Sequence, residues 1–293
     1  MRVALATCSA LPGLALDDRR LLGALASSGF EVRPVVWEDP LAEWSRFDFV
    51  LVRSCWDYAY RRAAFVKWAR SVERVALLRA SSRLIEWNTH KSYLLELSAR
   101  GVPTIPTSIV RRGEQVSLPE LAKARGFLYS PEGSVVVKAA VAQTGRYLWH
   151  GRADDPAGQE HLGKVTSIED ALVQPFVSSI QSTGERSLVF VCGKLTHAVE
   201  KRADGDNVLV HDDFGGSVSR VEPEEDEVRV ASEAIEACPE PPLYGRVDLV
   251  RGPDGPLLME LEVVEPELFL RFSADATQQL VSGVTRLVRG AAS

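Results

Sequence analysis

Short apolar runs alternate with amphipathic stretches over the first 80 residues. Apolar runs at residues 1–7, 30–37 and 47–58 predict strands, and the last contains FVLV, a continuous run typical of a strand buried on both faces. Residues 19–29 and 61–73 instead place apolar side chains at helical spacing. This alternation of strands and helices predicts a small α/β domain with a parallel sheet.

The carboxyl ends of those strands carry candidate ligand-binding residues. Ligands of parallel sheets gather at this edge, which holds Cys8 after the first strand and residues 53–57 after the third. We expect Arg53 and Asp57 to bind a substrate carboxylate or amine. A salt bridge between the strand end and the next helix is the alternative, and Cys8 and Cys55 are expected to be small buried residues.

The pattern changes near residue 87, where a helix and β-hairpins follow. The expected elements are a helix over 88–101 with Asn88 as its N-cap, strands over 134–141 and 171–177, and hairpins over 185–202 and 244–264. The hairpins are expected to turn at 192–194 and at 252–255, where glycine is present.

Composition and charge exclude several classes of protein. The chain has 293 residues, 45% of them apolar and 25% charged, which fits a globular protein of about two domains. Its net charge of −6 argues against a nucleic-acid binder with a broad basic face. Four cysteines without metal-ligand spacing favour a reducing compartment, and no apolar stretch is long enough for a membrane span. We expect a cytoplasmic protein that binds neither nucleic acid nor membrane.

Three carboxylates share one face of the second predicted hairpin. Glu260 and Glu262 are two residues apart, so they project to the same side of a strand, and Asp248 lies on the paired strand. Like charges this close repel unless a positive group lies between them. Such oxygen ligands suit Mg²⁺, and a solvated charged face without a metal is the alternative.

Several cations could hold a phosphate beside these carboxylates. Lys138 lies within an apolar strand, where a lysine needs a partner, either a phosphate or a structural salt bridge. Lys201 and Arg246 lie near the carboxylates in the predicted hairpins, and together these cations outline a polyphosphate clamp. The glycine-rich loops GxxxxGK[ST] and GxGxxG are absent, so a nucleotide would be held by side chains and strand backbone.

A series of segments in this order resembles the ATP-grasp ligases, particularly the branch containing bacterial glutathione synthetase and the ribosomal-protein glutamate ligases. The segments are WNTHKSYL, VVVKAA, LVQPFV, GERSLVFVCGK, DDFGGSV, RVD and ELE. The resemblance implies an α/β ATP-grasp fold, in which a Rossmann-like parallel-sheet domain precedes two α+β lobes that clamp ATP. It implies an N-terminal domain over 1–86, a central lobe with a lid over 87–172, and a C-terminal lobe over 173–293.

The same resemblance implies roles for individual residues, with ATP and Mg²⁺ as cofactors. Nucleotide contacts are implied for a helix lysine, Lys91, a strand lysine, Lys138, and for Gln174, Pro175, Phe176, Val177, Glu185 and Lys201. Metal ligands are implied at Asp248, Glu260 and Glu262, catalytic roles at Arg246 and Lys201, and a glycine loop near the substrate at Gly215 and Gly216. The chain departs from the family where Glu262 replaces a common asparagine and where the lid has few glycines.

Four phrases, VRSCWDY, WNTHKSYL, VPTIPT and ELEVVEPELFL, are similar to the cycloserine-synthetase group. Its members use ATP to close O-ureido-D-serine to D-cycloserine, which implies an acylphosphate attacked by a nitrogen of the same molecule. Glu265 is then a candidate general base or substrate ligand, with a surface charge as the alternative. An intermolecular carboxylate–amine ligase and a non-catalytic ATP-binding protein are the rival hypotheses. The family resemblance also allows a homodimer acting on an amino-acid-like carboxylate.

Overall fold

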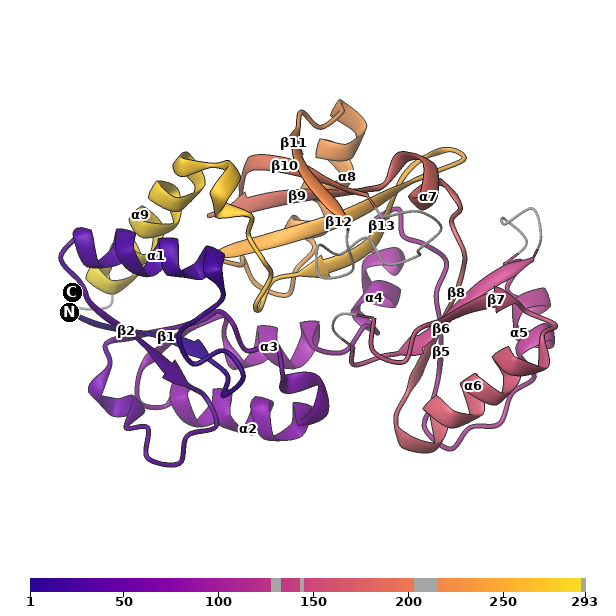
Figure 1. The fold of residues 1–293 in the computed structure, drawn as a ribbon, viewed down its shortest axis with the longest axis horizontal. Coiled ribbons are helices and arrows are strands. Elements are labelled where there is room, and N and C mark those ends of the chain that lie inside the picture. The colour runs from indigo at the N-terminus through magenta and orange to yellow at the C-terminus, as the bar shows by residue number, and fades with distance from the viewer. Residues whose placement is uncertain (128–132, 143–144, 203–215, 291–293) are drawn as a thin grey trace.

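The computed structural model describes residues 1–127, 133–142, 145–202 and 216–290, whose strands form three sheets (Figure 1). The N-terminal sheet has the order β2-β1-β3-β4, and every neighbouring pair is parallel, as predicted. Its elements are β1 (Arg2–Thr7), α1 (Leu16–Ser27), β2 (Glu31–Val36), β3 (Phe49–Val52), α2 (Arg62–Glu73) and β4 (Leu77–Arg79).

The central sheet is antiparallel and forms a lobe of its own, in the order β5-β8-β6-β7. Its core joins residues such as Val137 and Val173 of the sheet to Leu118 and Leu162 of the covering helices. The elements are β5 (Ser108–Val110), α5 (Leu118–Ala124), β6 (Ser134–Ala139), β7 (Trp149–Arg152), α6 (Pro156–Ile168) and β8 (Ala171–Pro175). Strands β6 and β8 were predicted, whereas β7 and α6 were not.

The C-terminal sheet is also antiparallel, in the order β11-β10-β9-β12-β13. Both predicted hairpins are confirmed, because β9 and β10 join at 192–193 and β12 and β13 join at 253–254. The elements are α7 (Ser179–Thr183), β9 (Glu185–Val191), β10 (Lys194–Arg202), β11 (Ser217–Val221), α8 (Glu225–Glu236), β12 (Tyr244–Gly252) and β13 (Gly255–Glu262).

The expected helix over 88–101 is shorter, α4 (Tyr93–Ala99), and a helix that was not expected, α3 (Ser82–Asn88), precedes it. Ser81 caps α3, and Asn88 is its last residue rather than the cap of the next helix. The Asn88 amide donates to Leu261 O at 2.8 Å and accepts from Val263 N at 2.9 Å. The side chain therefore joins the helix end to β13.

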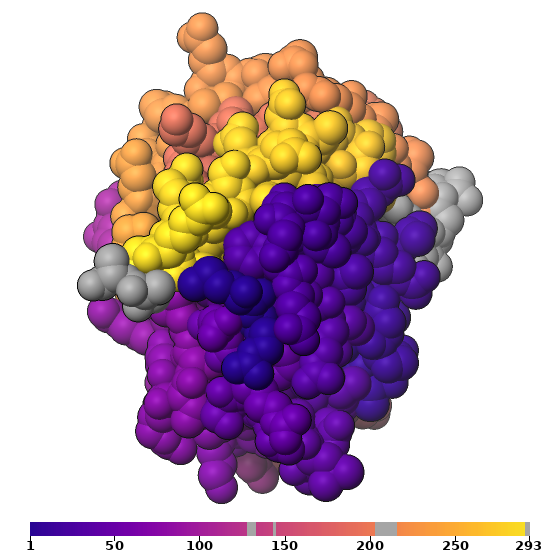
Figure 2. All heavy atoms as spheres, turned by 90° about the vertical axis from the view of Figure 1, so that its left-hand side faces the viewer, coloured from indigo at the N-terminus to yellow at the C-terminus, as the bar shows by residue number. Residues whose placement is uncertain are grey.

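The N-terminal and C-terminal sheets share hydrophobic cores, one of which includes Leu5 and Leu51 from the first and Val189 from the second. Helix α9 (Ala274–Gly290) contributes Leu280 to the same core and lies over α1, as the yellow and indigo atoms show in Figure 2. Three 3₁₀ helices, Trp44–Arg46, Tyr58–Tyr60 and Leu270–Phe272, complete the described elements. None of the described helices has the length and apolar character needed to cross a membrane.

Candidate active site

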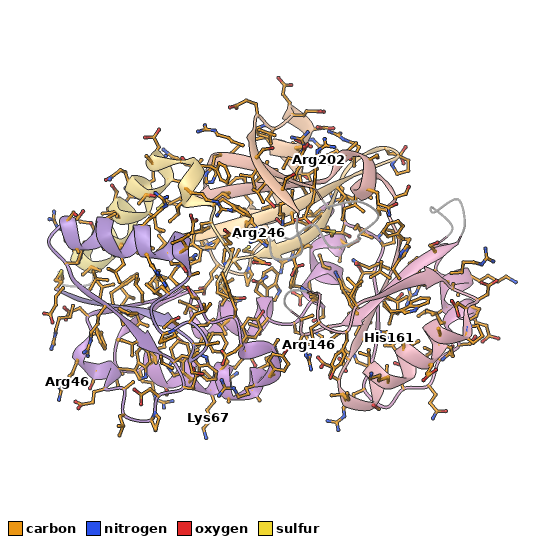
Figure 3. All side chains as sticks on the ribbon, in the orientation of Figure 1. Arg46, Lys67, Arg146, His161, Arg202 and Arg246 are labelled. Atoms are coloured by element: carbon orange, nitrogen blue, oxygen red, sulfur yellow. The ribbon has the colours of Figure 1, made fainter. Side chains whose placement is uncertain are left out.

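A cavity of about 210 Å³ lies between the central and C-terminal sheets. Strands β6 and β8 form one wall, and β12 and β13 form the opposite wall. Trp56, which follows β3, reaches it from the N-terminal domain. All three parts of the chain therefore meet at this cavity, and Arg246 lies near the centre of the molecule (Figure 3).

One end of the cavity is apolar. Its wall is a small hydrophobic cluster around Phe176, formed by Ile105, Val136, Phe176, Val177, Ile180, Val250 and Met259. The predicted hinge segment lies here, since β8 carries Gln174 and Pro175 into the cavity lining. Gln174 donates its amide to Thr107 Oγ1 at 2.9 Å. A flat apolar group has room to pack at this end, beside backbone that can offer hydrogen bonds.

The other end presents charges from two paired strands. Arg246 lies opposite Glu262, and Asp248 lies opposite Glu260, so all four belong to one face of the β12–β13 pair. The pairing shifts register between Asp248 and Leu249, and such bulges re-aim side chains beside functional sites. The hairpin prediction therefore placed these four charges together as they are found.

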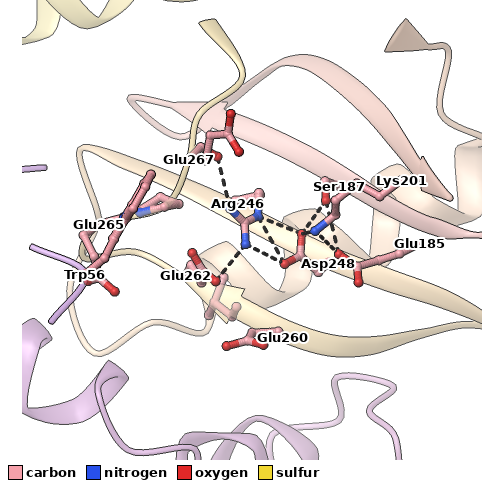
Figure 4. A network of polar contacts seen from close by, with 12 residues as sticks. Trp56, Glu185, Ser187, Lys201, Arg246, Asp248, Glu260, Glu262, Glu265 and Glu267 are labelled. Atoms are coloured by element: carbon pink, nitrogen blue, oxygen red, sulfur yellow. Dashed lines mark hydrogen bonds and ion pairs between the residues drawn. The ribbon is translucent and has the colours of Figure 1, made fainter. Parts of the chain in front are cut away.

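Arg246 is the centre of this charged face, although only 4% of it is exposed (Figure 4). Its guanidinium donates to Asp248 at 2.9 and 3.0 Å, to Glu262 Oε1 at 2.7 Å and to the Glu267 carbonyl at 3.2 Å. Burial alone favours the neutral acid, yet Arg246 and Lys201 hold the pKa of Asp248 well below its ordinary value. For Glu262 burial prevails, and its pKa is raised.

Lys201 and Glu185 form a second buried pair on the adjoining strands β10 and β9. Lys201 Nζ also lies 3.7 Å from Asp248, which links this pair to the Arg246 network. Burial raises the pKa of Glu185 to about 7, against the opposing charge of Lys201. Gly184, with φ of 76°, admits this approach because a Cβ there would lie 2.5 Å from the Lys201 carbonyl.

Lys91 supplies the positive charge beside Glu260. Its ammonium forms an ion pair with Glu260 Oε1, so the two neighbouring glutamates of β13 are each matched by a cation. Burial opposes ionisation of Glu260, but Lys91 and then Lys138 lower its pKa. Lys91 lies in the turn between α3 and α4, which corrects its expected position on a helix.

Lys138 differs from the other cavity cations. It extends from β6 into the cavity, and no described acidic side chain forms an ion pair with it. Burial lowers its pKa to about 8, and the charge of Lys91 adds to that effect. Burial and a second ammonium nearby both disfavour the charged form of this lysine, so an anion bound beside it would be stabilising. The predicted phosphate contact fits this environment, and the structural salt bridge does not.

The carboxylates of the cavity have the chemical character that a divalent cation prefers. Asp248, Glu260 and Glu262 offer hard oxygen donors on the cavity wall. Among the described residues no group of three or more acidic, histidine or cysteine side chains is gathered closely enough to hold a metal ion. Arg246 and Lys91 occupy the position between carboxylates that we expected Mg²⁺ to take. The metal set stays a prediction that requires these ion pairs to open.

Two predicted substrate ligands lie outside the cavity lining. Arg53 is 1% exposed and pairs with Asp18 at 2.8 Å, so it is a structural cation. Asp57 accepts from the Trp37 indole at 2.8 Å and pairs with Arg61. The alternative expectation, a salt bridge to the next helix, describes Asp57, because Arg61 directly precedes α2, whereas Arg53 pairs with α1. The C-terminal segment also occupies the guanidinium of Arg53, through the Pro266 carbonyl.

Glu265 and Gly216, two further predicted substrate ligands, are also outside the cavity lining. Glu265 is 4% exposed and faces the N-terminal domain, where, after burial, its charge raises the pKa of Cys55. Cys8 and Cys55 are both buried, as expected. Gly216 precedes β11 and does not line the cavity, and Gly215 lies outside the described residues.

From the sequence, Trp56 was expected either to wall the pocket or simply to pack, and Glu267 had no assigned role; both line the polar end. They are held by a segment in which four consecutive carbonyls, 264–267, accept hydrogen bonds. The donors, in chain order of the carbonyls, are Tyr244 at 2.9 Å, Trp56 at 2.9 Å, Arg53 at 2.7 Å and Arg246 at 3.2 Å. A dense run of carboxylates after a strand was the signal that could have pointed to Glu267.

The sequence of the chain is similar to known proteins. A family model described as D-cycloserine synthetase DcsG, N-terminal domain, matches residues 3–79. The cycloserine biosynthesis protein DcsG of Streptomyces lavendulae is 33% identical over 288 residues, covering 93% of this chain and 94% of that protein.

Solved structures agree with this similarity. The crystal structure of D-cycloserine synthetase DcsG matches with a TM-score of 0.87 and 31% identity, over 98% of this chain and 100% of that chain. D-alanine–D-alanine ligase from Bacillus anthracis, complexed with ATP, matches with a TM-score of 0.69 and 14% identity, over 99% of this chain and 98% of that chain. The second similarity establishes a common fold.

Proposed function

We propose a function for this chain from the premise that it belongs to the D-cycloserine synthetase (DcsG) family of ATP-grasp ligases. Within that family, we propose that it converts O-ureido-D-serine to D-cycloserine with ATP and forms ADP and phosphate. Similarity to DcsG over 93% of the chain supports this substrate.

The environment of Lys138 is the single observation that best supports ATP-dependent chemistry. The lysine is a desolvated cation without a described acidic partner, it lines a cavity, and the apolar end of that cavity can receive an adenine ring. Lys91 and Lys201 line the same cavity, so three ammonium groups are available to a polyphosphate. We propose that Gln174 to Val177 lie along the base and that Glu185 lies near the ribose.

At the same end, Asp248, Glu260 and Glu262 would hold Mg²⁺ through carboxylate oxygens once Glu260 and Glu262 leave their ion pairs with Lys91 and Arg246. When bound, Mg²⁺ would offset phosphate charge during transfer. Lys91 would then exchange its ion pair with Glu260 for a phosphate contact.

Arg246 is proposed to act on the reacting groups. Its guanidinium lines the cavity and is held in place by Asp248. We propose that it binds the substrate carboxylate and stabilises the charge that develops on the transferred phosphoryl group. Asp248 fixes its plane, and Lys201 offsets the negative charge of Asp248 and Glu185.

The proposed reaction balances in three steps. A carboxylate oxygen of the substrate attacks the γ-phosphorus, which forms an acylphosphate and releases ADP. The ureido nitrogen that is bonded to oxygen attacks the acyl carbon, loses its proton to solvent and expels phosphate. The five-membered ring then carries a carbamoyl group on nitrogen, and water removes it as carbamate. Because the nucleophile and the acyl group belong to one molecule, positioning supplies much of the rate.

The test is phosphate release with Mg-ATP and O-ureido-D-serine as the only organic substrate, followed by mass spectrometry of the product. We expect phosphate and D-cycloserine in equal amounts without an added amine. Phosphate release that requires a second amine would contradict ring closure and indicate an intermolecular ligase. ATP binding without turnover on any acid would contradict a ligase function.

A further inference from the structure

Glu267 is an acidic side chain at the cavity that neither the nucleotide nor the metal needs. It lines the polar end, with its side chain 27% exposed, and its carbonyl accepts from Arg246 at 3.2 Å. Its position is fixed twice, through that carbonyl and through an ion pair between its carboxylate and Arg271. A carboxylate held this rigidly is available to a cationic group of a ligand.

Trp56 gives the same end an aromatic wall. Its indole nitrogen donates to the Glu265 carbonyl at 2.9 Å, which fixes the ring while 37% of the residue stays exposed. An exposed tryptophan at a cavity offers its face to a cation, because the ring quadrupole is negative there. Figure 4 shows Trp56 and Glu267 on the side of Arg246 away from Glu185 and Lys201.

The distribution of charge separates two subsites. Lys91, Lys138 and Lys201 line the cavity and are proposed to hold the phosphates. Figure 4 shows Lys201 and Glu267 on opposite sides of Arg246. A carboxylate there repels phosphate, so it is poorly suited to the nucleotide. Beside Arg246, which can take a carboxylate, it completes a site for a zwitterion.

We propose that Glu267 binds the α-ammonium group of the substrate, with the Trp56 ring packed against it, and so selects α-amino acids over other carboxylic acids. This inference rests on the proposed ligase function. The substrate carboxylate binds Arg246, and the substrate ammonium binds Glu267. These two contacts fix the substrate so that its ureido nitrogen is directed toward its own acyl carbon. Both are specificity-determining positions.

Two substrates and two variants test this pair of contacts. The substrates are O-ureido-D-serine and 3-(ureidooxy)propanoate, which keeps the carboxylate and the ureido group but lacks the amine. Glu267→Gln removes the charge and keeps the shape. Glu236→Gln makes the same change on the exposed last residue of α8 and is the matched control.

We expect Glu267→Gln to raise KM for O-ureido-D-serine about 10- to 100-fold, the range for losing a charged hydrogen bond. KM for ATP should stay within about twofold, since Glu267 is not at the phosphate end. The wild-type preference for the amine-bearing substrate should shrink in Glu267→Gln and persist in Glu236→Gln. A purely structural role for Glu267 would lower activity on both substrates equally.

The outcomes separate the two proposals. If wild-type enzyme turns over O-ureido-D-serine and Glu267→Gln leaves its preference unchanged, this inference is wrong and the ligase function stands. If wild-type enzyme turns over no carboxylic acid, the ligase function fails and this inference fails with it. If only acids without an amine are turned over, the ligase class stands and the ammonium site is wrong.

Trp56 adds an independent readout. Trp56→Leu removes the ring face and should raise KM for O-ureido-D-serine about 2- to 30-fold, the range for a cation–π contact. Trp56→Phe keeps a ring and should lose less. An equal rise in KM for 3-(ureidooxy)propanoate in Trp56→Leu would show that the ring packs without recognising the ammonium.

Discussion

Two buried arginine–aspartate pairs lie in this molecule and have different uses. Arg53 pairs with Asp18 at 2.8 Å, and Arg246 pairs with Asp248 at 2.9 Å, with each arginine at most 4% exposed. The spare donors of Arg53 include one bonded to the Pro266 carbonyl, so that pair joins the N-terminal domain to the C-terminal segment. Arg246 instead lines the cavity.

Burial and charge alone therefore do not mark a functional residue here. Both pairs are desolvated. For Arg53 and Arg246 alike, burial lowers the pKa, but the neighbouring groups, the acid first among them, together raise it by more, so the pKa lies above its ordinary value. The difference is the surface that each guanidinium faces. Variants of the two arginines should accordingly separate stability from catalysis.

The largest expected effect follows from Arg53→Met, which keeps volume and leaves Asp18 buried without its cation. Breaking a buried pair in this way costs about 3–5 kcal/mol of unfolding free energy. The additional change Asp18→Asn should recover at least about 1 kcal/mol, because it removes the unpaired charge. Urea unfolding of both variants gives the values, and kcat per folded molecule should remain near that of wild type.

Arg246→Lys is the counterpart on the cavity side. It keeps the positive charge next to Asp248 but loses the planar guanidinium with its several N–H donors, so kcat should fall about 10²- to 10³-fold. Phosphate-release kinetics measure this, and urea unfolding should show less destabilisation than Arg53→Met. A variant that loses stability while retaining kcat would place Arg246 with Arg53 as a structural cation.

Lys138→Met should change function and stability in opposite directions. Losing a phosphate contact raises KM for ATP about 10- to 100-fold. Removing a desolvated cation should stabilise the ligand-free protein by about 1–3 kcal/mol at pH 7. Denaturation without nucleotide, together with ATP kinetics, tests both, and destabilisation would indicate that Lys138 has a structural partner.

The smallest effect is a pH dependence that belongs to the same lysine. Its pKa is about 8 in the folded protein, so the charged form that binds phosphate is lost as pH rises above 8. KM for ATP should rise up to about tenfold per pH unit there, and Lys138→Met should lack this rise. Because the unfolded chain keeps its proton up to the ordinary pKa of 10.5, ligand-free stability should increase between pH 8 and 10.5. A pH-independent KM for ATP would contradict the phosphate contact.

The sequence was sufficient for regular, locally encoded features. The parallel N-terminal sheet followed from apolar periodicity, and both hairpins followed from their turn residues. Two-residue alternation then placed Glu260 and Glu262 on one face, opposite Arg246 and Asp248. These features depend on neighbours along the chain or across one turn.

Features that depend on packing between distant segments were not accessible. Arg53 and Asp57 were expected to face a ligand, but both are held by other groups of the protein, Arg53 by the Pro266 carbonyl and Asp57 by Arg61. Strand β13 ends at Glu262, so alternation no longer indicates which way Glu265 and Glu267 point. The ion-pair partners of the cavity lysines likewise could not be predicted from the sequence, because Lys91 and its partner Glu260 are 169 residues apart.

The most direct test of the account uses O-ureido-D-serine labelled with ¹⁸O in its carboxylate, turned over with Mg-ATP. Formation of an acylphosphate transfers one carboxylate oxygen to the γ-phosphorus, so the released phosphate should carry one ¹⁸O atom. D-cycloserine should keep the other. Unlabelled phosphate alongside D-cycloserine, or label in AMP, would contradict activation of the substrate by phosphoryl transfer at the Arg246 face.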